Sequence, residues 1–68
     1  MNKKRIEERI RILTESAHRE LKWAVDGLEK KEMYLSVACS YVKSANEDLI
    51  RAQELKELLY SMEQEELA

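Results

Sequence analysis

The chain of 68 residues has no proline, no phenylalanine, one glycine and one cysteine. A β-sheet needs tight turns, and so little glycine and proline leaves almost nothing to build them from. A single cysteine cannot form an internal disulfide, which excludes an oxidised, secreted miniprotein and fits a reducing cytoplasm better. The sequence also lacks an apolar run near the ~20 residues of a membrane span and the apolar centre of a signal peptide. These absences favour a soluble all-α protein.

The residues that are present form a mixture typical of amphipathic helices, with 44% hydrophobic and 38% charged. Such a chain is too hydrophobic for a disordered tail and too charged for a buried helix. Its length allows a single helical domain, residues 1–68, and chains this short bury only about 60% of their unfolded surface. An isolated monomer would therefore be marginally stable, and we expect a surface that meets a partner.

The net charge of −2 hides an asymmetry between the two halves of the chain. Residues 1–31 carry nine basic and six acidic side chains, whereas residues 32–68 carry three basic and eight acidic ones. The two halves therefore have charges of +3 and −5. Each exposed ion pair stabilises a fold by only ~0.2–1 kcal/mol, so the pattern sets orientation rather than stability. It favours antiparallel helices, within one chain or between two.

Two apolar stripes at helical spacing predict two helices, over about residues 3–29 and about residues 32–66. The first stripe is centred on Ala17 and the second on Ala45. Small side chains recur on both stripes and would let the helices approach closely. The members of the stripes are Ile6, Ile10, Leu13, Ala17, Leu21, Ala24 and Leu28, followed by Tyr34, Ala38, Tyr41, Ala45, Leu49, Ala52 and Leu59.

The turn between the helices is predicted within residues 27–32, centred near residue 30. Gly27 could be the left-handed residue that follows a helix end, because Asp26 and Gly27 form the only turn-like dipeptide. Leu28 still follows the first stripe, however, and residues 29–32 are the most polar block between the two stripes. The polar block is therefore the preferred position.

The alternative to a hairpin is a three-helix bundle with a break near Ser44. Ser44 and Glu47 have the spacing of a capping box, although the second stripe passes this point without a change of phase. Two helices alone cannot enclose a core, because each leaves half of its stripe in water. We therefore predict an all-α antiparallel helical hairpin that dimerises into a four-helix bundle.

A stripe of another kind on the first helix mixes basic and large apolar residues. Trp and Arg are the residues most enriched at the energetic centres of protein interfaces, so the stripe predicts a docking face for a larger protein. In the competing interpretation, Ile12 and Trp23 widen the core by touching a third helix or a second subunit. The residues assigned to partner binding are Arg5, Arg9, Ile12, Arg19 and Trp23.

Two other functions are alternatives to protein docking. The docking face could contact phosphates and stack on bases, but an isoelectric point of about 5.4 and the neighbouring glutamates disfavour a nucleic-acid partner. Glu15 and His18 have the E-x-x-H spacing of di-metal helical bundles, but both would lie far from the apolar stripe, so they are weak metal candidates.

The sequence contains few residues that are suited to catalysis. There is one histidine, no glycine-rich phosphate loop, and a lone Cys39 without a histidine nearby. We therefore expect a non-enzymatic cytoplasmic regulator or inhibitor without cofactor or membrane contact, of bacterial or phage type on size and composition alone. It would act as a homodimer that docks on a larger protein. A nucleic-acid-binding accessory protein and a di-metal carboxylate/His bundle are the alternatives.

Overall fold

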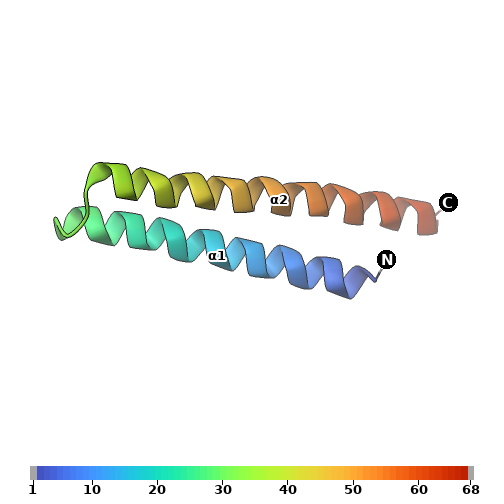
Figure 1. Cartoon of the computed structure of the whole chain (residues 1–68). Helices are drawn as coiled ribbons and strands as arrows, with labels where there is room; N and C mark the ends of the chain where they lie inside the picture. The colour runs from blue at the N-terminus through green and yellow to red at the C-terminus, as the bar shows by residue number, and fades with distance from the viewer. Residues whose placement is uncertain (1, 68) are drawn as a thin grey trace.

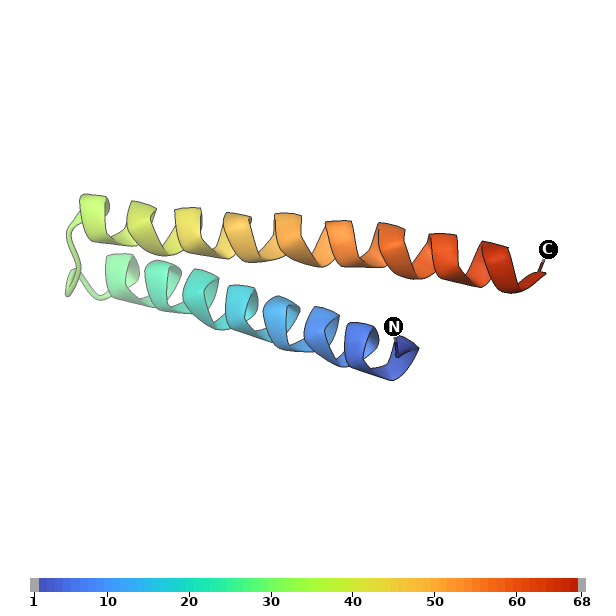
Figure 2. The same ribbon diagram turned by 45° about the vertical axis from the view of Figure 1, so that its right-hand side comes forward.

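The computed structural model describes residues 2–67, which form two α-helices, α1 (Lys3–Glu29) and α2 (Leu35–Leu67). Figure 1 shows the helices side by side and antiparallel, with both termini at the same end of the molecule. They stay adjacent in the rotated view of Figure 2, where α2 extends beyond the start of α1. The result is a rod of 54 × 15 × 14 Å. The predicted all-α helical hairpin is confirmed.

The two helices meet along a seam of small side chains. Ala38, Ala45 and Ala52 repeat every seven residues along α2 and are at most 5% exposed. This heptad spacing keeps one side of a helix facing its neighbour as the pair winds around each other. Among residues 2–67, the buried residues of the helices are Ile6, Leu13, Ala17, Ala24, Gly27, Ala38, Ala45 and Ala52. The seam thus follows the centres of the two predicted stripes.

Several larger members of the stripes are not covered by the hairpin. Leu21 is 38% exposed, Leu28 41% and Leu49 43%. Each lies to one side of the alanine seam, where the opposite helix does not reach. The hairpin by itself therefore hides mainly its smallest apolar side chains.

Tyr34 was expected in the core, and this expectation is wrong, because its side chain is 84% exposed. It lies just before α2, where its carbonyl oxygen accepts hydrogen bonds from the backbone N–H groups of Val37 (3.0 Å) and Ala38 (3.1 Å). A residue at this position starts the helix without helical backbone geometry of its own. The helical spacing that places Tyr34 on the stripe therefore does not apply to it.

The loop at residues 30–34 ends α1 with a Schellman motif. The N–H of Glu32 donates to the carbonyl of Gly27 (3.0 Å), and the N–H of Lys31 donates to that of Leu28 (3.2 Å). Lys31 takes the left-handed position of the motif, with φ of 57°. The turn is therefore later than the predicted 27–32, and α2 begins at Leu35 rather than near residue 32.

Gly27 does not end α1, so the possibility that it is the left-handed residue is wrong. It is buried inside the last turns of the helix. A Cβ atom at this position would lie 2.8 Å from Cε and 3.0 Å from Cβ of Met33. The glycine thus leaves room for the Met33 side chain, which would have to shift if residue 27 carried a Cβ atom.

The three-helix alternative is also wrong, because α2 continues through Ser44 without a break. Ala45 lies on the seam at this point and is fully buried, so packing against α1 holds the segment helical. At the other end of the rod, Asn2 caps α1 by accepting a hydrogen bond from the Lys4 N–H (2.8 Å). Lys3 and Glu66 form an ion pair that joins the two helices there.

Candidate protein-docking groove

The five residues predicted to bind a partner all lie on α1, and all are exposed. Ile12 is 42% exposed and Trp23 50%. The structure divides the predicted face into two parts. Arg19 and Trp23 line a groove in the half of the rod near the loop. Arg5, Arg9 and Ile12 line a shallow hollow near the start of α1, together with Lys4 and Glu8.

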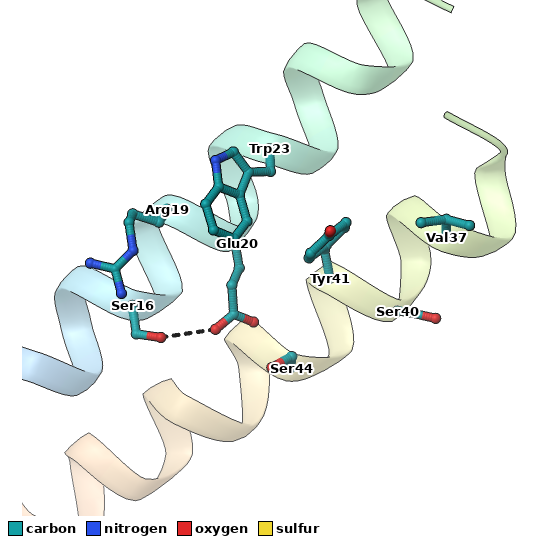
Figure 3. A pocket seen from close by; sticks show the side chains of 8 residues that line it. All are labelled: Ser16, Arg19, Glu20, Trp23, Val37, Ser40, Tyr41 and Ser44. Atoms are coloured by element: carbon teal, nitrogen blue, oxygen red, sulfur yellow. Dashed lines mark hydrogen bonds between the residues drawn. The ribbon is translucent and has the colours of Figure 1, made fainter. Parts of the chain in front are cut away.

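The Trp23 groove lies between α1 and α2 and has a volume of ≈ 380 Å³. Figure 3 shows its side chains coming from both helices. Three serines line the groove, and their small size leaves the space between the larger side chains open. The lining residues are Ser16, Arg19, Glu20, Trp23, Val37, Ser40, Tyr41 and Ser44.

Trp23 and Tyr41 form the aromatic wall of the groove. Their ring centroids lie 5.8 Å apart with an angle of 69° between the planes. This is the edge-to-face geometry that aromatic pairs prefer, and such pairs contribute about 0.5–1.5 kcal/mol beyond their burial. The tyrosine therefore holds the indole in one orientation while half of the tryptophan stays open to solvent.

Glu20 crosses from α1 toward α2 beside the aromatic wall (Figure 3). Its Oε1 accepts a hydrogen bond from the Ser16 hydroxyl at 2.9 Å. Its Oε2 is shielded from solvent and has no hydrogen bond of ordinary geometry. The nearby Ser44 hydroxyl is the main cause that holds the pKa of Glu20 below its ordinary value, with Ser16, Asp48 and Arg19 acting in the same direction against desolvation. Glu20 is therefore a carboxylate at neutral pH.

The predicted arginines keep their charges free for a partner. Among residues 2–67, Arg5, Arg9 and Arg19 form no ion pair. Arg11 differs, because it binds Glu8 and also donates to Glu15 at 2.8 Å. These bonds raise the pKa of Arg11 and lower that of Glu8.

The metal candidates do not form a cluster. Glu15 and His18 are both exposed, and Glu15 accepts the hydrogen bond from Arg11. Within residues 2–67 no group of three or more His, Cys, Asp or Glu side chains is placed to hold a metal ion. Neither helix in this range combines the length and the apolar character needed to cross a membrane.

The sequence reasoning missed part of the groove. Tyr41 was expected in the core, whereas the structure places it half-buried against Trp23. Glu20, Ser40 and Ser44 were not assigned to the site. A signal was present, because Ser40 and Ser44 lie one turn apart on the same side of α2 as Tyr41. Their meeting with Trp23 depends on the register between the helices, which no local pattern specifies.

No protein-family model, curated protein or solved structure matches this chain. The functional conclusion therefore comes from the groove and its surroundings alone.

Proposed function

We propose that the hairpin is a small, non-enzymatic, cytoplasmic regulator or inhibitor, which acts by docking on a larger protein through the Trp23 groove. The observation that carries this proposal is the half-exposed Trp23, held edge-on by Tyr41 beside an open groove. A tryptophan with a fixed orientation loses little conformational entropy when a partner covers it. Such residues are the typical energetic centres of protein interfaces.

An apolar side chain of the partner would enter the groove between Trp23 and Val37. Burial of the exposed half of the indole would then drive binding, since aromatic side chains dominate the energy of interfaces. The exposed Arg19 beside the groove would pair with a carboxylate of the partner at the rim of the contact. Charged rim contacts of this kind steer association and add specificity more than affinity.

The hollow near the start of α1 would extend the same contact. Ile12 lies eleven residues before Trp23, a separation of roughly 16 Å along a helix. A partner segment of about three helical turns could therefore bridge the two positions. Arg5 and Arg9 would flank its far end with positive charge. This geometry favours a partner surface that is acidic at its edges and apolar at its centre.

The proposed working form is a homodimer of hairpins in which the Trp23 groove stays open. A groove on each copy would let one dimer bind two partner molecules. Bridging two copies of a partner is one way in which a protein without an active site can regulate a larger one.

The test is capture of the partner from cells that express the protein, with Trp23→Ala compared to Ile50→Ala. Ile50 is also a large apolar residue with a similar exposed fraction, 53% against 50% for Trp23, but it does not line the Trp23 groove. The Trp23 change should abolish capture, a loss of at least about 2 kcal/mol at an interface centre. The Ile50 change should leave partner capture intact.

Fluorescence of Trp23, the one tryptophan in the chain, gives a second measurement. Its emission should shift to shorter wavelength when the captured partner is added back, because the indole leaves water. If the partner binds Trp23→Ala as tightly as wild type, the Trp23 groove is not the docking site.

A further inference from the structure

The side of the hairpin opposite the Trp23 groove carries a second surface, which is apolar and uncovered. At about 100° per residue, Leu21 and Val25 lie on the other side of the α1 seam from Trp23. On α2, Val42 likewise lies opposite to Tyr41. We call this surface the aliphatic flank; its members are Leu21, Val25, Leu28, Leu35, Val42 and Leu49, with exposed fractions from 38% to 67%.

The aliphatic flank is free of charge. Within residues 14–28 and 35–49, no charged side chain falls within about 90° of the seam on this side of either helix. The charged residues of these segments project instead toward the groove or away from the partner helix. An exposed apolar surface of this continuity marks an interaction site rather than an ordinary solvated face.

We infer that a second copy of this chain covers the aliphatic flank. A second copy laid along the whole rod would cover its long face of 54 × 15 Å, roughly 800 Å², the area that each partner contributes to a standard protein interface. The aliphatic flank would be the apolar part of that contact, in the half near the loop. This inference deepens the proposed homodimer, and it does not depend on whether the Trp23 groove binds a partner.

Charge selects the arrangement of the two copies. With the loops at the same end, α1 of each copy packs beside α2 of the other, and the aliphatic flanks face each other. The start of α1, which carries Lys3, Lys4, Arg5, Arg9 and Arg11, then lies at the same level as the end of the second copy's α2, which carries Glu57, Glu63, Glu65 and Glu66. The reversed orientation would place the aliphatic flank of each copy against the charged open end of the other. The assembly is therefore a four-helix bundle with all loops at one end.

The first test is the solution mass by light scattering, with Val42→Glu compared to Val37→Glu. These valines are on the same helix and are 47% and 43% exposed, but only Val42 lies on the aliphatic flank. Wild type and Val37→Glu should have twice the mass of 8.1 kDa. Val42→Glu should raise the dimer dissociation constant at least about tenfold. A wild type of single mass, or a Val37 effect as large as that of Val42, overturns the inference.

The second test uses charge rescue to separate loss of the interface from loss of folding. Leu21→Lys and Val42→Glu should each be monomeric with retained helical circular dichroism. Mixing them should restore the dimer, because Leu21 of one copy lies beside Val42 of the other in the inferred bundle. Failure of the mixed chains to associate, while each variant alone remains helical, overturns the arrangement of α1 beside α2.

The third test measures orientation with spin labels on Gln64→Cys in a Cys39→Ser background. Both positions are exposed, and Cys39 is the one native thiol. Loops at the same end predict a label separation near the width of the bundle, roughly 20–30 Å. A separation close to the 54 Å length of the rod would show the reversed orientation and overturn the charge argument. Val37→Glu is the one variant within the Trp23 groove, and it is tested for solution mass alone, so failure of these tests would leave the partner-docking proposal standing.

Discussion

The rod divides at Ala17 and Ala45 into two halves that are built differently. The open half, at the termini, buries the large side chains of Ile6 and Leu13. The loop half buries only alanines and Gly27, while its larger apolar residues remain exposed on both sides of the seam. Among residues 2–67, the one ion pair between the helices, Lys3 with Glu66, also belongs to the open half.

This difference separates the parts of the molecule that hold it together from the parts that can bind. Burial stabilises a fold in proportion to the apolar area removed from water, so an alanine contributes far less than a leucine. The loop half gains little free energy from burial of its seam. Because the helices lie close together there, Trp23, Tyr41 and the aliphatic flank remain at the surface. The open half therefore buries more of the large apolar side chains, and the loop half holds the Trp23 groove and most of the aliphatic flank.

The largest effect is expected from Leu13→Ala in the open half. Leu13 is 7% exposed, and truncation of a buried leucine costs about 2–4 kcal/mol through lost burial and the cavity left behind. The measurement is urea denaturation followed by circular dichroism at a fixed protein concentration. Leu58→Ala is the control, because Leu58 is 37% exposed and its truncation should lower the free energy of unfolding much less. Equal losses would contradict the assignment of Leu13 to the buried core of the open half.

Ala45→Leu tests the seam itself. Ala45 is 0% exposed between the helices, so three added carbon atoms must push the helices apart at a cost of about 1–3 kcal/mol. Asn46→Leu adds a side chain of the same kind at the next, exposed position and should change the free energy of unfolding little. The measurement is the melting temperature of both variants. A tolerated leucine at position 45 would mean that the seam is loosely packed.

Lys31→Gly should stabilise the loop half by about 0.5–1 kcal/mol. Lys31 has φ of 57°, a conformation that costs most side chains about 1–2 kcal/mol and glycine almost nothing, while the freer unfolded glycine offsets part of the gain. Lys30→Gly is the matched control, because Lys30 has ordinary right-handed geometry with φ of −84°. Chemical denaturation should therefore show a gain at position 31 and none at position 30.

The smallest effect concerns Glu20 and depends on pH. Because the folded state lowers the pKa of Glu20, its carboxylate stabilises the fold above the ordinary carboxyl pKa, and this stability is lost as the pH falls through the lowered value. Wild type should therefore have a higher melting temperature than Glu20→Gln at neutral pH, and the difference should shrink in acidic buffer. A difference that is unchanged between the two pH values would contradict the assigned cause.

The seam and the helices could be predicted from the sequence because both follow from local spacing. Alanines at every seventh position identify the contact side of α2 without knowledge of α1. At Ser44 the sequence makes two opposite predictions, because a capping pattern favours a break and the unbroken stripe favours a continuous helix. Packing of Ala45 decided in favour of the stripe.

The loop and the groove could not be predicted to the same degree. A lysine in the left-handed position leaves no signal, because glycine is the residue that usually marks such a site. The pair of Trp23 and Tyr41 requires one particular register between two antiparallel helices, and a shift of one turn would separate them. The exposure of Trp23 could be foreseen from its position off the stripe, but its aromatic partner could not.

The alanine seam also limits how this sequence can drift over evolutionary time. At Ala38, Ala45 and Ala52 only glycine and serine are of comparable size, so most single-base changes that replace the alanine put a larger residue in the seam. Exposed positions on the outer sides of the helices carry no such restriction. In a lineage descended from this chain, the outer surface could therefore change readily while the three seam positions stay almost frozen.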